Sequence, residues 1–165
     1  MPFTKADKEK LLEQLNALLQ SRVEDFTRIA RETARGATHE EAKPEDDKDT
    51  RALEQTYLAR GQAERVVAAE HELQVFRSMK RRTWELGEPI ASGALVTLTD
   101  ESESERSFLL LPLGAGLKLE LAGVSVQVIT PTSPLGEALL GQEEDDSVEV
   151  FIGGARRDWD VVAVL

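Results

Sequence analysis

The chain has 165 residues, of which 41% are hydrophobic, contains no cysteine and carries a net charge of −11 at neutral pH. This composition argues against disorder throughout the chain, and the lack of cysteine excludes disulfides and thiolate metal sites. The first residues lack the apolar core of a signal peptide, and no run approaches the roughly 20 apolar residues that span a bilayer. We therefore expect a cytoplasmic protein with no membrane contact.

The charge is distributed unevenly along the chain. Residues 1–84 hold 16 acids and 16 bases, whereas residues 85–165 hold 15 acids and 4 bases, so the second half should repel nucleic acid. Within the first half, residues 38–51 hold 6 acids and 3 bases, which leaves 10 acids and 13 bases in the remaining 70 residues. The pattern predicts an acidic centre between mildly basic arms, although a solvated turn with a chance charge bias would look the same.

Two long helices are predicted in the first half. Thr4 and Asp7 make a capping box, and a helix to about Ala34 follows from apolar residues at three- and four-residue steps, namely Leu11, Leu12, Leu15, Leu18, Leu19, Val23, Phe26 and Ile29. The stretch from Gly36 to Pro44 interrupts this pattern and predicts a turn. A second helix is expected from about Glu45 or Asp49 to Arg82, with one apolar side made of Leu53, Tyr57, Leu58, Val66, Val67, Leu73, Phe76 and Met79.

The two helices predict an antiparallel α-helical hairpin, or coiled coil, over residues 1–84, with its acidic tip near residues 38–51. Each arm of about 30 residues would be about 45 Å long, which suggests either a reaching device or a dimerising coiled coil. Residues 33–52 contain no large aliphatic side chain, so we expect the tip to face water or a partner.

The second half, residues 85–165, has the two-residue periodicity of β-strands after a linker marked by Pro89 and Gly93. A mostly antiparallel sheet is expected, with strands at 94–98, 107–111, 117–121, 124–129, 148–152 and 159–164. Between the fourth and fifth strands, Ser133 is a candidate N-cap, Pro134 a first helical residue and Gly141 a helix terminator. The whole chain is thus predicted to be an α+β protein with a helical hairpin followed by a small sheet domain that carries one short helix.

Carboxylates at the hairpin tip form the densest cluster of candidate metal ligands. Four acids lie within five positions after Pro44, namely Glu45, Asp46, Asp47 and Asp49. Carboxylate oxygens suit Mg²⁺, and Asp46 and Asp49 would share one face of a helix, although acids in a first helical turn also have a capping role. Such a tip would complete a site half-built by another protein, since it could not bind Mg²⁺ tightly alone. Neither His39 nor His71 adds a specific pattern, and we find no phosphate-binding loop and no HExxH sequence.

The C-terminal string VITPTSPLGEALLGQEEDDSVEV, followed by a glycine pair and WDVVAVL, resembles the C-terminal domain of the Gre transcription factors. The match covers residues 128–165 well and 94–111 loosely. The tip segment THEEAKPEDDKDTRALEQTYLARGQ also resembles a distinct Gre-like subgroup. This resemblance implies an N-terminal hairpin followed by an FKBP-like sheet domain.

The resemblance further implies an accessory factor, and not an enzyme, whose partner is bacterial RNA polymerase. The sheet domain would bind the rim of the secondary channel through Thr132, Ser133, Pro134 and Leu135. The tip acids Glu45, Asp46, Asp47 and Asp49 would act in trans near the RNA 3′ end, with Asp46 and Asp49 sharing Mg²⁺ with the polymerase, and a monomer is expected.

The tip differs from the GDLxENAEY-like string that is usual in the family. Two activities therefore stay open: stimulated cleavage of backtracked transcripts, or channel entry that inhibits the polymerase without cleavage. Functions of other classes are an FKBP-like prolyl isomerase and a structural coiled-coil dimer. An isomerase pocket of that type is lined by aromatic rings, and residues 85–165 contain Phe108, Phe151 and Trp159 as their aromatic residues.

Overall fold

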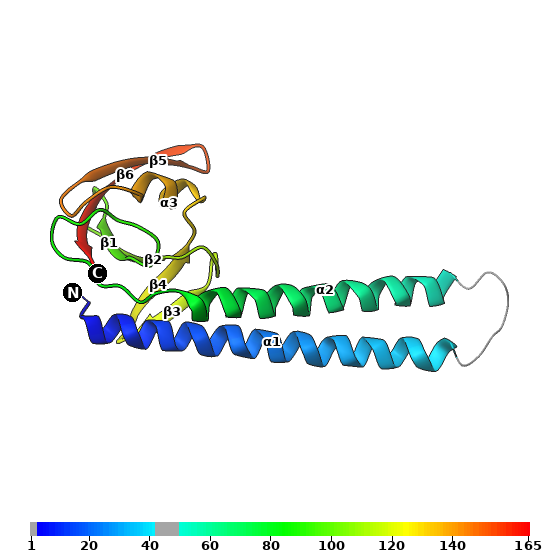
Figure 1. Cartoon of the computed structure of the whole chain (residues 1–165). Helices are drawn as coiled ribbons and strands as arrows, with labels where there is room; N and C mark the ends of the chain where they lie inside the picture. Colours follow the sequence, from blue (N-terminus) through cyan, green and yellow to red (C-terminus); the bar gives the residue numbers. More distant parts are fainter. Residues whose placement is uncertain (1–2, 42–49) are drawn as a thin grey trace. The chain divides into compact units, whose positions relative to one another are not determined.

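The computed structural model describes residues 3–41 and 50–165 (Figure 1). Its elements are, in chain order, α1 (Lys5–Glu41), α2 (Thr50–Ser78), β1 (Leu95–Thr99), β2 (Glu105–Leu110), β3 (Lys118–Leu121), β4 (Val124–Ile129), α3 (Pro134–Leu139), β5 (Ser147–Ile152) and β6 (Ala155–Val164). The α+β class is confirmed. Two compact units form, a helix pair over residues 16–78 and a sheet unit that combines the residues up to Leu15 with residues 79–165. The modules expected from the sequence were 1–84 and 85–165. The structure differs because the residues up to Leu15 and residues 79–84, which the sequence assigned to the hairpin, belong to the sheet unit.

Helix α1 begins as the sequence predicts and ends later. The backbone N–H of Thr4 donates to the Asp7 carboxylate at 3.0 Å, and the Asp7 N–H donates to the Thr4 hydroxyl at 3.2 Å, so the capping box is present. The expected break at Gly36 is wrong, because the helix continues to Glu41. A single glycine costs a helix about 1 kcal/mol, which 37 residues of helix tolerate.

Helix α2 ends at Ser78, four residues before the predicted end at Arg82. The segment after Ser78 belongs to the sheet unit, where Trp84 is 4% exposed. The carbonyl of Arg82 accepts a hydrogen bond of 2.7 Å from the Lys8 ammonium group. Burial of Trp84 and this bond hold the segment in a conformation that a helix could not adopt.

The helix pair is antiparallel, and its contacts follow a seven-residue repeat. Arg22 forms an ion pair with Glu72 at 3.0 Å, and the Arg77 guanidinium donates to Asn16 and Gln20 across the pair. Buried or half-buried side chains recur at alternating steps of three and four, at Leu19, Arg22, Phe26, Ile29 and Thr33 in α1 and at Gln55, Ala59, Gln62, Val66, Ala69, Leu73 and Phe76 in α2. This spacing is the coiled-coil seam.

The apolar side predicted for α2 is therefore wrong in its outer half. Four of its members are more than half exposed, namely Leu53, Tyr57, Leu58 and Val67. Burial of Leu73 and Phe76 fixes which side of α2 faces α1. Continued along the helix toward Thr50, the same side carries Gln62 and Gln55. The large apolar side chains of the sequence indicated one face of α2, whereas the residues that contact α1 follow the seven-residue repeat along a different face.

The six strands form one mixed sheet in the order β3-β4-β2-β1-β6-β5. Four pairs are antiparallel, and β2 with β4 is parallel, since β3 lies between them in the chain and pairs with β4 at the edge. All six expected strands are confirmed within a few residues. The tight β5–β6 turn uses Gly153 at φ 62° and Gly154 at φ 81°, which a side chain would strain.

Both faces of the sheet carry buried side chains, although the outward sides of β5 and β6 are largely exposed. One face holds the main core, in which α3 contributes Leu135 and Leu139 to a cluster with Trp84, Ile90, Ala94, Val96, Leu98, Phe108, Leu110, Ile129, Val148, Val150, Trp159 and Val161. On the other face the start of α1 lies against the strands: the side chains of Leu15 and Val128 both approach Gly114, and the Gln14 amide donates to the carbonyl of Glu120 at 2.9 Å. Among the residues described, no helix has the length and apolarity that crossing a bilayer requires.

The seam assignment predicts different effects at two adjacent valines. Val66 is half-buried on the seam, and Val67 is 65% exposed. We expect Val66→Ala to destabilise α2 by about 1 kcal/mol relative to Val67→Ala, because both changes bring the same gain in helix propensity but one loses packing. Hydrogen exchange of the α2 amides measures the difference; equal protection in the two variants would contradict the assigned phase.

The buried ammonium of Lys8 predicts a dependence of stability on pH. Burial lowers its pKa from 10.5 to about 8. Between pH 8 and 10.5 the unfolded chain holds a proton that the folded chain has released, so the free energy of unfolding should rise with pH in this window. Urea unfolding of Lys8→Met should lack this rise, whereas the exposed-site control Lys10→Met should keep it. Parallel profiles for the wild type and Lys8→Met would refute the assignment.

Candidate functional site

The segment before α3 is a rigid turn held by Ser133. This residue is the N-cap, with φ −76° and ψ 152°, and its hydroxyl accepts from the Gly136 N–H at 3.1 Å. The same hydroxyl donates to the carbonyl of Thr130 at 2.7 Å. One side chain thus joins the end of β4 to the first turn of α3.

Gly136 allows α3 to approach the end of β4 closely. A Cβ atom at this position would lie 2.0 Å from the carbonyl oxygen of Thr130, a contact that no side chain can make. The sequence pattern identified the cap and the closing Gly141, which has φ 80°, but it did not identify Gly136. No local signal separates a glycine needed for close approach from one in a turn.

The four residues predicted to contact a partner differ in their exposure. Thr132 and Pro134 are exposed, and Ser133 is half-buried with its hydroxyl engaged twice. Leu135 is 6% exposed, and its side chain packs in the core of the sheet unit, where it holds the turn against the sheet. The surface that the turn offers therefore consists of the Thr132 and Pro134 side chains.

The tip acids predicted to act in trans and to share a metal ion, Glu45, Asp46, Asp47 and Asp49, lie outside the described residues. The structure gives the helix ends on either side of them, Glu41 in α1 and Thr50 in α2. Within residues 3–41 and 50–165, no group of three or more His, Asp or Glu side chains is placed to hold a metal ion.

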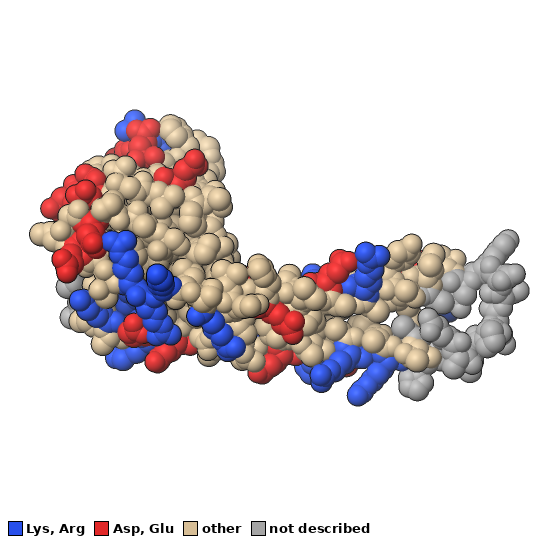
Figure 2. Space-filling view, in the orientation of Figure 1, with Lys and Arg blue, Asp and Glu red and all other residues tan. Residues whose placement is uncertain are grey.

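Basic side chains gather on the outer part of α1. Arg28, Arg31 and Arg35 recur at steps of three and four, and together with Val23, Glu24, Thr27 and Glu32 they line a groove of about 580 Å³. Figure 2 shows lysine and arginine side chains along this part of the helix pair. Arg28 is paired with Asp25 at 3.2 Å and with Glu32 at 3.6 Å, and the Asp25 hydrogen bond raises its pKa further above the ordinary range. The sequence predicted basic arms but did not locate this face.

Comparisons with known proteins find one family. The family model described as "Transcription elongation factor, GreA/GreB, C-term" matches residues 87–165. Transcription elongation factor GreA of Xanthomonas axonopodis pv. citri (strain 306) is 31% identical over 166 residues, covering 99% of this chain and 96% of that protein. The GreA protein of Polaromonas naphthalenivorans (strain CJ2) is 29% identical over 169 residues, covering 100% of this chain and 97% of that protein.

Two solved structures also match nearly the whole chain. GreA factor homolog 1 (Gfh1) of Thermus thermophilus is 23% identical, with a TM-score of 0.39 and a coverage of 99% of this chain and 97% of that chain. A further structure of the transcription factor Gfh1 is 24% identical, with a TM-score of 0.41 and a coverage of 98% and 95%.

The two roles of the Ser133 hydroxyl can be separated by substitution. We expect Ser133→Ala to lower the free energy of unfolding by about 1–2 kcal/mol, since it loses both the cap and the bond to the Thr130 carbonyl. Ser133→Asp can accept from Gly136 but cannot donate to Thr130, so it should recover part of the loss. Urea unfolding measures both variants, with Thr132→Ala as an exposed control expected to change little. A loss in Thr132→Ala as large as in Ser133→Ala would contradict the role given to Ser133.

Proposed function

The chain belongs to the GreA/GreB family of transcription elongation factors, and on that premise we propose that it binds bacterial RNA polymerase at the rim of the secondary channel and stimulates cleavage of backtracked transcripts. The observation that carries this proposal is the acidic sequence between two long helices. Four carboxylates lie within five positions of the chain between Glu41, the last residue of α1, and Thr50, the first residue of α2. The 29 residues of α2 correspond to about 43 Å of helix, so Thr50 is far from Ser78 at the other end of α2.

The tip carboxylates suit a shared magnesium ion. Asp46 and Asp49 are the residues that would hold it, with Glu45 and Asp47 beside them, and hard oxygen donors of this type are the ligands that Mg²⁺ prefers. When bound beside a second ion, Mg²⁺ activates water and supports a leaving oxygen. The protein supplies ligands to the active site of the polymerase, and it is therefore an accessory factor and not an enzyme in its own right.

The turn before α3 supports the docking role. Thr132 and Pro134 are exposed on a backbone that Ser133 fixes at both ends, so little conformational entropy is lost when a partner binds there. Leu135, buried beneath, and Ser133, with its hydroxyl engaged, act by holding these two side chains in place. This assignment gives the four residues of the turn different parts in one binding surface.

The arginine face of α1 supports an indirect contact with RNA. Arg28, Arg31 and Arg35 are exposed, and they lie on the part of α1 that leads to the acidic segment. Cationic side chains attract a phosphate backbone irrespective of its sequence. A transcript that approaches the helix pair would thus meet the positive charge of Arg31 and Arg35 on α1.

The number of acids in the tip segment favours a second function, which is inhibition of the polymerase. Four acids repel one another and exceed what capping of α2 requires, and they could bind the metal of the polymerase in a way that hinders nucleotide addition. Inhibition without cleavage is therefore the alternative outcome.

Two further alternatives are of other classes. Against an isomerase, Phe108 and Trp159 pack edge to face with ring centroids 6.3 Å apart and are both buried, so these rings build the core. A structural dimer would use the exposed side chains of Leu53, Tyr57, Leu58 and Val67, and the mass of the protein in solution distinguishes it from the monomer that we propose.

The function is tested by adding the protein to RNA polymerase stalled in a backtracked state with Mg²⁺ and following the length of the RNA. We expect shortening of the RNA by the wild type, and at least a tenfold slower cleavage with Asp46→Asn and Asp49→Asn combined, because amides are poor Mg²⁺ ligands. Glu64→Gln, which removes an exposed acid of α2, is the matched control and should cleave at the normal rate.

Polymerase binding is measured separately for each variant. Unchanged RNA with slowed extension would replace the cleavage function by inhibition. Full-rate cleavage by the double variant would show that Asp46 and Asp49 are not the ligands.

A further inference from the structure

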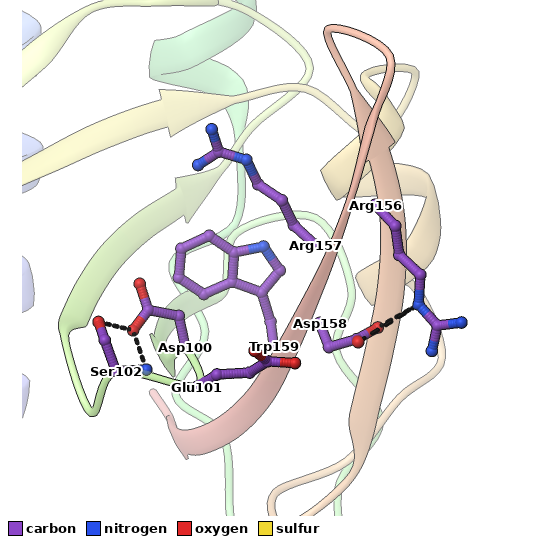
Figure 3. A pocket seen from close by; sticks show the side chains of 7 residues that line it. All are labelled: Asp100, Glu101, Ser102, Arg156, Arg157, Asp158 and Trp159. Atoms are coloured by element: carbon purple, nitrogen blue, oxygen red, sulfur yellow. Dashed lines mark hydrogen bonds and ion pairs between the residues drawn. The ribbon is translucent and has the colours of Figure 1, made fainter.

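A small pocket in the sheet unit is lined by residues that belong to neither the α3 turn nor the helix pair. It has a volume of about 260 Å³ and is bounded by the turn after β1, with Asp100, Glu101 and Ser102, and by the start of β6, with Arg156, Arg157, Asp158 and Trp159 (Figure 3). Every lining residue belongs to one compact unit. The pocket is therefore a property of the sheet unit alone.

The indole N–H of Trp159 is a buried donor without an acceptor. Trp159 is 3% exposed, and its Nε1 atom has no hydrogen-bond partner among the described residues. The other tryptophan of the chain shows the ordinary arrangement, since Trp84 Nε1 donates to the carbonyl of Pro89 at 2.9 Å. An unsatisfied buried donor costs about 1–3 kcal/mol, a cost that a ligand oxygen would remove.

Neighbouring side chains hold the indole ring in its orientation. Phe108 packs against it edge to face, and the Arg106 guanidinium lies 5.5 Å from the ring centroid. Figure 3 shows the ring nitrogen on the edge that faces Arg157, with the side chain of Arg157 reaching past the indole. Arg157 and Trp159 both line the pocket and lie two residues apart in β6, so their side chains belong to the same face of that strand.

Arg156, Asp158 and Asp100 of the pocket already interact with other groups of the sheet unit. Arg156 pairs with Glu149 at 2.8 Å and with Asp158 at 3.1 Å, and Figure 3 shows the pair with Asp158 directed away from the indole. The Oδ1 atom of Asp100 accepts from the N–H and the hydroxyl of Ser102, at 3.0 and 2.6 Å, and from the N–H of Ser104 at 3.1 Å.

Arg157 differs from these groups. Among the residues that the structure describes, it makes no ion pair and no side-chain hydrogen bond. The Arg157 guanidinium and the Trp159 N–H are therefore donors of the pocket without an acceptor in the described part of the protein, and an oxygen acceptor would satisfy both.

We propose that this pocket is a binding site for a carboxylate group, which accepts one hydrogen bond from Trp159 Nε1 and pairs with the guanidinium of Arg157. A carboxylate offers two oxygens in one plane and forms charge-assisted bonds with arginine. The volume accommodates a small acid or one acidic side chain. Asp100 and Glu101 at the rim disfavour a doubly charged phosphate, because their charges repel it more strongly than a single negative charge.

The source of the carboxylate is either a free organic acid or an Asp or Glu side chain of a protein segment. Both present the same chemistry to Arg157 and Trp159. The site does not rest on the proposed action at the polymerase, since none of its residues belongs to the tip or to the α3 turn.

The two tryptophans provide a direct test in the ¹⁵N-labelled full chain. Its spectrum contains two indole N–H resonances, and that of Trp84 is an internal reference because its hydrogen bond to Pro89 is already made. Titration with sodium acetate, against sodium chloride at equal ionic strength, should shift the Trp159 resonance saturably and leave the Trp84 resonance in place. Absence of such a shift with every carboxylate tried overturns the proposal.

Two further titrations identify the source and the charge. Tighter binding of acetyl-aspartyl-amide than of acetate supports a protein side chain, and tighter binding of acetate or glutarate supports a free acid. Inorganic phosphate should bind at least tenfold more weakly than acetate, and stronger binding of phosphate would overturn the assignment to a carboxylate.

Substitutions separate the pocket from a general effect of charge. Arg157→Gln should weaken acetate binding at least tenfold, whereas Lys118→Gln, which removes the same charge from β3, should change it less than twofold. Equal weakening by the two variants counts against the site. Trp159→Phe keeps the ring and removes the donor; its fold is checked by circular dichroism, and Arg157→Gln provides the test if this variant does not fold.

Discussion

Three segments of the sheet unit that are far apart in sequence meet at the ammonium group of Lys8. This group donates to the carbonyls of Arg82 and Leu165, both at 2.7 Å, and lies 4.5 Å from the centroid of the Trp84 ring. The first turns of α1, the segment after α2 and the end of β6 are thereby joined at one buried charge. The sheet needs this arrangement because its second face would otherwise be exposed: Leu11 and Leu15 are fully buried there together with strand residues such as Val128.

The stability of the helix pair falls with distance from Asn16 and Ser78. Near Asn16 and Ser78 the seam contains Leu19, Leu73 and Phe76, which bury large apolar surfaces. Further out the same seam positions hold Gln62 and Gln55, and the large apolar side chains of α2 point elsewhere. Packing contributes most of the stability of helices in proteins, so the outer turns depend more on intrahelical bonds and on surface ion pairs such as Arg60 with Glu64. A weakly packed end can adjust to a partner at low energetic cost.

The functional features belong to different physical classes. At the α3 turn, one hydroxyl and one glycine fix the backbone, so the exposed Thr132 and Pro134 are presented rigidly. At the acidic segment, like charges are concentrated, a situation that a cation or a complementary surface relieves. In the pocket beside Trp159, the indole N–H lacks an acceptor and Arg157 lacks an ion pair among the described residues, so the pocket favours a ligand with oxygen acceptors. The proposed docking, metal binding and recognition of a carboxylate therefore do not compete for the same residues.

The sequence by itself determined the elements that depend on local chemistry. The capping box of Thr4 and Asp7, the Ser133 cap with Gly141 behind it, the glycine pair of the last hairpin and the alternating strands are all present, because each is specified by neighbours within a few residues. The sequence also located the acidic segment and, through its resemblance to a family, the α3 turn. Tertiary structure decided which face of α2 enters the seam and where α2 ends. It also decided that Leu135 is a core residue and that Trp159 stands beside Arg157 without an acceptor. Each of these depends on contacts between distant parts of the chain, where burial and helical phase outweigh local preference, and no single stretch of residues contains that information.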